Sequence, residues 1–317
     1  MVFERKHIDK TIVVLSLVPV LLQFFFSGAG AIMLGANWLA AGLFAWIIWD
    51  DIERHHLGLV DRNHSISISW ALISLVLNYA YVNFNEYEID HYTLFVVGGF
   101  LIILSVSMRS WQMKVAPLHF ILSGVIIGLL STRSPYCLLW IILFPVIFYH
   151  MRSWSKENWG SITTGIVLAV WMSYAVRLIF IGEESVGQLW HNYSTFVDGL
   201  LPDPLTYSVW EWVFLVFTAL LLIIYSISGF FLEVTKTVKA NASIIMLSTL
   251  SLILTIISLI DLSHLPNYLG LLSIFLSYQI SIHQSCIIDA KNDWWTVSIL
   301  ILYAVFSIFP IFLPYFF

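Results

Sequence analysis

Long uninterrupted apolar runs follow one another along almost the whole of this 317-residue sequence, and charged residues are confined to the short segments between them. Only 10% of the residues are charged, whereas a soluble domain carries roughly 25%. So little charge cannot cover a surface that faces water. Most of the chain is therefore expected to face lipid or to be buried inside the protein.

The runs predict membrane-spanning helices rather than strands. A helix needs about 20 apolar residues to cross a bilayer, whereas a strand needs about 10 residues of alternating polarity. The runs here are long and do not alternate. We therefore expect an all-α polytopic transmembrane bundle of about eleven spans, forming a single transmembrane domain over residues 1–317. The expected spans are Thr11–Ser27, Asn37–Trp49, Ile66–Phe84, Tyr92–Met108, Val115–Leu130, Tyr136–His150, Ser161–Ile181, Val209–Leu232, Ser243–Ile260, Pro266–His283 and Trp294–Phe316.

The segments between the spans are polar or rich in glycine. We expect a tight turn over Gly28–Gly35, a polar loop over Asp50–Ser65 and an acidic loop over Asn85–His91. Because Asn37–Trp49 is short, it is expected to be tilted or partly re-entrant. The longest connection, Gly182–Ser208, is expected to be either a binding loop or a short interfacial helix.

Basic residues predict the orientation of the chain. Loops on the cytoplasmic side of a membrane are enriched in Lys and Arg. Of the 14 Lys and Arg residues, 12 fall on one side of the expected topology: Arg5, Lys6, Lys10, Arg54, Arg62, Arg109, Lys114, Arg152, Lys156, Lys236, Lys239 and Lys291. The N-terminus is therefore expected in the cytoplasm, and an odd number of spans places the C-terminus outside.

The two exceptions, Arg133 and Arg177, lie at the outer ends of spans. A guanidinium at this depth suits phosphate, because it combines a fixed charge with paired hydrogen-bond donors. We therefore regard both as candidate ligands of a lipid-linked phosphate. Alternatively, both are interfacial anchors that pair with Glu183, Glu184 or a lipid headgroup.

Outer acids and aromatic residues are the remaining candidates for chemistry. Enzymes that move a sugar from a lipid carrier need an outward-facing carboxylate as base, and the pair Glu183 and Glu184 follows Arg177 closely. A second acidic set is formed by Glu86, Glu88 and Asp90, although a positive-inside bias also leaves acids on this side. Aromatic rings stack on sugars and also populate membrane interfaces. The candidates of this kind are Trp190, His191 and Tyr193.

No cofactor or metal site is predicted. The histidines His55, His56 and His64 lie among acids on the cytoplasmic side, but their spacing matches no zinc pattern. A divalent cation is compatible with this composition without being supported by the spacing. The sequence contains no nucleotide-binding glycine loop and predicts no nucleic-acid partner. The spacing Gly124-x-x-x-Gly128 instead predicts close packing between two helices.

The stretch Gly124–Trp154 resembles membrane-embedded glycosyltransferases that use lipid-linked sugars. In those enzymes a helix of small residues is followed by G-L-x-x-x-T/S-R-x-P and by an apolar helix that ends in a basic and aromatic cluster. The matching residues are Gly128, Leu129, Thr132, Arg133, Pro135, Arg152 and Trp154. The resemblance implies a polyprenyl-phosphate-linked sugar as substrate.

A second resemblance is to a family of bacterial integral membrane proteins of the inner membrane with no assigned activity. It covers Trp70–Trp190 and includes a cluster formed by Arg152, Trp154 and Trp159. The glycosyltransferase pattern is not complete, because those enzymes carry an acidic pair in the first outer loop, which here has no acid. The pair Asp50 and Asp51 is expected on the cytoplasmic side and would supply these acids only in the opposite topology.

The sequence thus predicts a bacterial inner-membrane protein that is similar to such glycosyltransferases and handles a lipid-phosphate-linked sugar or glycan at its outer face. The alternative is a non-catalytic membrane subunit or scaffold of an envelope or secretion complex. Membrane lipid is the partner expected in both cases, and a membrane-protein partner is expected in the second.

Overall fold

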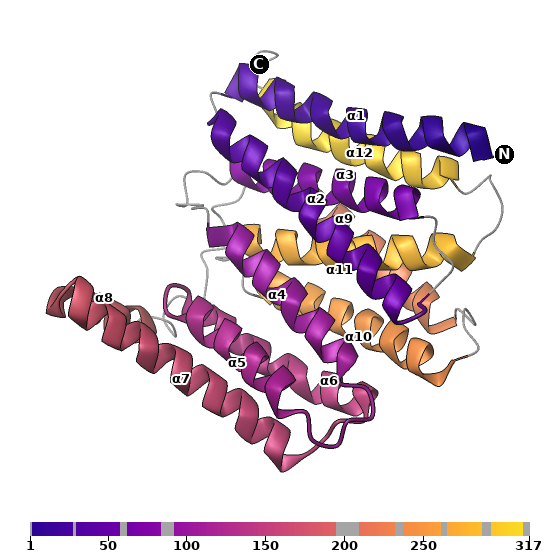
Figure 1. The fold of residues 1–317 in the computed structure, drawn as a ribbon. Coiled ribbons are helices and arrows are strands. Elements are labelled where there is room, and N and C mark those ends of the chain that lie inside the picture. The colour runs from indigo at the N-terminus through magenta and orange to yellow at the C-terminus, as the bar shows by residue number, and fades with distance from the viewer. Residues whose placement is uncertain are drawn as a thin grey trace. The chain divides into compact units, whose positions relative to one another are not determined.

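The computed structural model describes residues 2–27, 30–57, 62–83, 92–194, 209–231, 237–260, 265–286 and 293–312. All regular structure within these ranges is helical, so the predicted all-α class is confirmed (Figure 1). The helices are α1 (Val2–Ser27), α2 (Ala31–Arg54), α3 (Arg62–Asn83), α4 (Tyr92–Arg109), α5 (Pro117–Ser131), η2 (Pro135–Leu143), α6 (Phe144–Met151), α7 (Lys156–Phe180), α8 (Glu183–Ser194), α9 (Val209–Phe231), α10 (Val238–Ile260), α11 (Leu265–Cys286) and α12 (Asp293–Phe312).

Within the described ranges, 6 helices are long and apolar enough to cross a bilayer: α2, α3, α4, α7, α9 and α10. Shorter apolar segments lie in α1, α5, η2 with α6, and α12. The predicted span Pro266–His283 corresponds to α11, which is less apolar because it carries Asn267, Gln279 and several serines. These helices fit a multi-pass membrane protein. The count of eleven spans and the orientation stay predictions.

Helix α2 is longer than predicted at both ends. It begins at Ala31, so Gly35 lies inside the helix rather than in a turn, and it continues to Arg54 without a re-entrant break. Asp50 and Asp51 are therefore helical, and the predicted loop over Asp50–Ser65 is wrong for this part. An ion pair of 2.7 Å between Arg54 Nε and Asp50 Oδ2 spans one helical turn and favours this continuation.

The predicted span Tyr136–His150 is not one regular helix. Residues Pro135–Leu143 form the 3-10 helix η2, and only Phe144–Met151 continue as the α-helix α6. Pro145 stands in the first turn of α6 and has no backbone N–H, so it cannot extend an α-helical hydrogen-bond ladder back into η2. Arg152 then ends α6 in a left-handed conformation with φ 53°.

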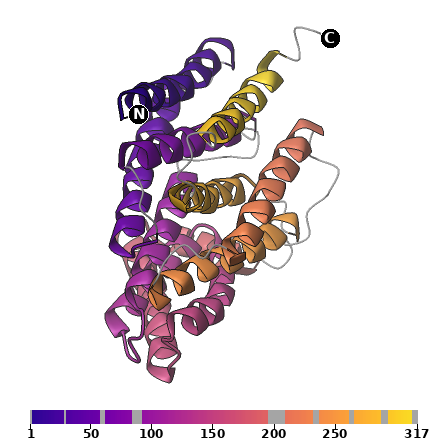
Figure 2. The ribbon, with the colours of Figure 1, turned by 90° about the vertical axis from the view of Figure 1, so that its right-hand side faces the viewer.

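The helices form two compact units: residues 1–97, 204–260 and 264–317 belong to unit 1, and residues 98–203 and 261–263 belong to unit 2. Helices α3 and α11 are central in unit 1. Helix α11 contacts α2, α3, α9 and α10, and α3 also contacts α1 and α12. Figure 2 shows α11 between the purple and indigo helices α2 and α3 and the orange helices α9 and α10.

Polar side chains of α11 pair with its neighbours inside unit 1. The hydroxyl of Tyr278 donates to Asp51 Oδ2 over 2.7 Å, and both residues are fully buried. The amide of Gln279 donates to the hydroxyls of Ser226 and Ser251, each over 2.9 Å. Because buried polar groups are costly without partners, these bonds fix which helix faces meet.

Unit 2 is built on close contact between α5 and α7. A Cβ atom added at Gly124 would lie 2.3 Å from the backbone oxygen of Ile162, and one added at Gly165 would lie 2.4 Å from the backbone oxygen of Ile121. Gly128 is also too close to α7 to carry a side chain. The close packing predicted from Gly124-x-x-x-Gly128 is therefore confirmed.

Alanine at Gly165 is expected to destabilise the protein by about 1–3 kcal/mol, because its methyl group would push α7 away from the backbone of α5. Alanine at Gly160 is the matched control in the same helix, since no atom lies within 4 Å of the added Cβ. It is expected to stabilise by up to about 1 kcal/mol through helix propensity. Thermal unfolding of the purified chain in detergent measures both, and equal effects of the two changes would contradict this account.

Phenylalanine at Tyr278 is expected to destabilise unit 1 by about 1–3 kcal/mol, because it removes a donor from the buried Asp51 carboxylate. The change Tyr174→Phe is the control, since that side chain is 43% exposed on α7. Thermal unfolding in detergent again provides the measurement. A Tyr278→Phe protein as stable as the Tyr174→Phe protein would show that the Asp51 bond adds nothing.

Candidate functional site

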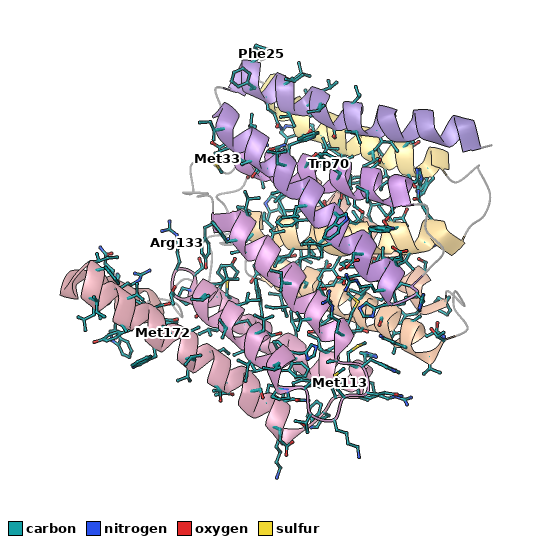
Figure 3. The ribbon with its side chains drawn as sticks, in the orientation of Figure 1. Phe25, Met33, Trp70, Met113, Arg133 and Met172 are labelled. Atoms are coloured by element: carbon teal, nitrogen blue, oxygen red, sulfur yellow. The ribbon has the colours of Figure 1, made fainter. Side chains whose placement is uncertain are left out.

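Arg133 and Arg177, the two arginines that the sequence places at the outer ends of spans, lie in unit 2. They are found where α5 ends and where α8 begins. We call this region the Arg133 end of unit 2. Helix α5 stops at Ser131, and the following backbone turns back through hydrogen bonds from Arg133 and Ser134 to the carbonyl of Leu130. Arg133 is exposed and lies at this end in Figure 3, at the opposite end of unit 2 from Met113.

Tyr193 of α8 is joined to the end of α5 by a hydrogen bond. Its hydroxyl lies 2.8 Å from the hydroxyl of Ser131, and the Ser131 hydroxyl itself donates to the carbonyl of Gly128 over 2.8 Å. Because a serine hydroxyl has one hydrogen, Tyr193 must be the donor in the first bond. One hydroxyl pair therefore joins α8 to α5.

The surroundings of Tyr193 keep its hydroxyl protonated. Burial raises the pKa of Tyr193 above its ordinary value of 10.0, and the nearby Cys137 raises it further. The hydrogen bond with Ser131 and the positive charge of Arg177 act in the opposite direction without cancelling the effect of burial. Since the folded-state pKa is raised, the stabilising neutral hydroxyl persists up to pH 10 and is lost only as the pH rises through that pKa.

Arg177 is near enough to Tyr193 for its positive charge to act on the pKa of that hydroxyl. It lies in the last turn of α7 and is half-buried, while the N–H groups of Ile181 and Gly182 donate to its carbonyl. A left-handed Gly182, with φ 105°, then allows the chain to enter α8. The end of α7 thus brings the Arg177 guanidinium to the same region as Tyr193 and Ser131.

Helix α8 occupies residues that were expected to form either a loop or a short interfacial helix. It is amphipathic, because Leu189 is buried whereas the neighbouring Trp190 is 72% exposed and His191 is also exposed. Trp190 and His191 therefore lie on the exposed face of α8, whereas Tyr193 contacts Ser131 of α5. The backbones of Glu183 and Glu184 begin α8, and their side chains lie outside the described residues.

The structure thus brings Tyr193 and Arg177 together at the end where Arg133 also lies. Sequence reasoning missed Ser131 and the buried Cys137, which complete this region. The run Ser131-Thr132-Arg133-Ser134-Pro135 carried a signal, since hydroxyl residues flank the cation at a helix break. The predicted acidic set Glu86, Glu88 and Asp90 lies outside the described residues, so no contact is assigned to it.

The other acidic pair, Asp50 and Asp51, does not act as a unit. Asp50 pairs with Arg54, whereas Asp51 is fully buried and accepts a hydrogen bond from Tyr278. The histidines His55 and His64 are also buried in unit 1. Among the side chains that the structure describes, no group of three or more His, Cys, Asp or Glu could hold a metal ion.

Removal of the Tyr193 ring is expected to expose Cys137, which is fully buried and acts electrostatically on the Tyr193 hydroxyl. In a Cys286→Ser background, Tyr193→Ala should therefore speed the reaction of Cys137 with a small maleimide several-fold. Trp190→Ala is the matched control from the same helix, because that ring is already exposed. The assignment fails if the two variants react at equal rates.

Comparisons with protein-family models, with curated proteins and with solved structures find no match to this chain.

Proposed function

We propose that this chain is a polytopic membrane protein that binds a phosphate-bearing lipid at the Arg133 end of unit 2. The observation that carries the proposal is the placement of Tyr193 near Arg177, at the end where Arg133 is exposed. Two guanidinium groups supply charge and hydrogen-bond donors of the kind that phosphate oxygens accept.

The depth of this end in a bilayer suits a lipid phosphate. Helix α8 buries Leu189 and exposes Trp190, as expected for a helix that lies along a membrane interface. Arg133 and Arg177 are the exceptions to a basic bias that otherwise marks the cytoplasmic side. These patterns support an outer location for the Arg133 end, and the resemblance to bacterial integral membrane proteins supports the inner membrane of a bacterium.

The substrate class follows from the resemblance to glycosyltransferases of lipid-linked sugars. On this proposal Arg133 and Arg177 hold the phosphate of a polyprenyl-phosphate-linked sugar, and the exposed Trp190 and His191 contact the sugar. Glu183 and Glu184, in the first turn of α8, are the proposed carboxylates for sugar transfer.

A second candidate function is that of a non-catalytic membrane subunit, and helix α7 favours it. Only 17% of the apolar segment of this helix is buried inside the protein. Val167, Trp171 and Met172 all lie exposed along it, and Figure 3 shows Met172 on its outer surface. A partner helix would cover this surface in a complex, as lipid covers it in an isolated protein.

Binding of a polyprenyl phosphate tests the proposed function directly. Native mass spectrometry of the purified chain should show that it retains the phosphate and not the corresponding polyprenol. Arg133→Gln and Arg177→Gln should each weaken retention about tenfold, because each removes a charge-assisted hydrogen bond. Arg54→Gln is the control, since this cation lies in unit 1 and its exposed ion pair contributes little.

Equal retention of the polyprenol would show that the phosphate is not recognised. Unchanged affinity in both Arg133→Gln and Arg177→Gln would remove these arginines from the site. A protein partner that co-purifies stoichiometrically, together with unchanged function in both arginine variants, would favour the second candidate function.

A further inference from the structure

The opposite end of unit 2 contains an open cavity of about 520 Å³. We call this region the Arg152 end of unit 2. The cavity lies where α4 connects to α5 and where α6 connects to α7, and Figure 3 shows Met113 of the first connection at this end. Its lining residues are Lys114, Val115, Phe148, Tyr149, Arg152, Trp154, Ser155 and Glu157.

One buried side chain fixes both connections around the cavity. The amide nitrogen of Asn158 donates to the carbonyl of Ser153 over 2.6 Å and to that of Lys114 over 3.2 Å. Its amide oxygen accepts from the backbone N–H of Ala116 over 2.9 Å. Because Asn158 is fully buried, these bonds are shielded from water and hold the two connections together.

Arg152 is held in place independently of Asn158. The backbone N–H of Gln112 donates to the carbonyl of Met151 over 2.8 Å, which joins the two connections a second time. The left-handed backbone of Arg152 ends α6, and its guanidinium carbon lies 5.6 Å from the centre of the Trp111 ring. This cation–π contact orders the side chain before any ligand arrives.

The lining carries more positive than negative charge. Lys114 and Arg152 contribute two cations, and Glu157 is the single carboxylate. In the part of the chain that the structure describes, neither cation forms an ion pair. A net positive lining, with Arg152 held against Trp111, favours an anionic ligand with several acceptor oxygens.

Apolar and amphipathic side chains surround the same cavity. Trp154 is 62% exposed and Tyr149 is 75% exposed, and such rings are typical of the interface between a bilayer and water. Leu118, in the first turn of α5 directly after the lining residues, is 80% exposed. A soluble anion would gain nothing from this apolar surface, whereas acyl chains would cover it.

We propose that this cavity binds the phosphate of an anionic phospholipid headgroup, with Lys114 and Arg152 as its ligands and the acyl chains against Leu118. Basic sites at the cytoplasmic ends of membrane helices attract such headgroups. The site shares no residue with the Arg133 end of unit 2, and it does not depend on the proposed function. The same cations would also attract free phosphate, so the experiment distinguishes the phosphate of a lipid headgroup from free phosphate.

Native mass spectrometry of the full chain, purified in a neutral detergent, measures the retained lipids. The protein is incubated with equal amounts of phosphatidylglycerol and phosphatidylcholine that have identical acyl chains. The wild-type chain should retain phosphatidylglycerol in preference. The double variant Lys114→Gln/Arg152→Gln should lose this preference, with affinity for phosphatidylglycerol lowered about tenfold or more.

A second double variant, Arg109→Gln/Lys156→Gln, is the matched control. It removes the same net charge at the same end of unit 2, from exposed residues that do not line the cavity. This variant should keep the wild-type preference. Equal losses in the cavity variant and in the matched control would overturn the proposal in favour of a diffuse basic surface.

Two further results would overturn the proposal. One is equal retention of the two lipids by the wild-type chain, because it would show that the cavity does not select an anion. The other is displacement of phosphatidylglycerol by sodium phosphate or glycerol 3-phosphate, because it would identify a site for free phosphate. Thermal unfolding of each variant confirms that the comparison is made between folded proteins.

Discussion

A bilayer offers no water to polar groups, so each hydroxyl and amide inside it needs a partner within the protein. The serines and threonines of this chain meet that need largely by bonding to the carbonyls of their own helices. Ser251 shows how such a residue also joins helices, because it donates to Ser248 and accepts from Gln279. The specificity of packing in unit 1 therefore depends on a few amide and carboxylate groups, of which Asp51 with Tyr278 is the most buried.

In unit 2 the same need for internal partners is combined with close backbone contact. Gly124 and Gly165 allow the backbones of α5 and α7 to lie in contact. This contact fixes how far apart the two helices lie at each end of the pair. At one end Tyr193 can reach Ser131, and at the other Asn158 can reach the connection before α5. Both candidate binding regions thus depend on Gly124 and Gly165, although neither glycine contacts them.

The helical class and the α5 packing motif could be predicted because they depend on local composition and on residue spacing. The burial of Asp51 could not be predicted, since its partner Tyr278 lies 227 residues away in the sequence. Hydropathy alone also misjudged Tyr136–His150, where Pro145 interrupts the α-helical ladder. For the candidate site, residue type identified Tyr193 and Arg177, but only tertiary structure could supply Ser131 as the partner of Tyr193.

The bonds around Asn158 have a mechanical consequence for α7. At the Arg152 end, the buried Asn158 amide of this helix donates to the carbonyls of Ser153 and Lys114 and accepts from the backbone N–H of Ala116. At the Arg133 end, the described side chains join the following helix α8 to α5 through the hydroxyl pair of Tyr193 and Ser131. Movement of α7 at its Arg152 end must therefore break the bonds that join Asn158 to Lys114 and Ala116 in the connection before α5. Movement of α8 away from α5 must break the hydrogen bond between Tyr193 and Ser131.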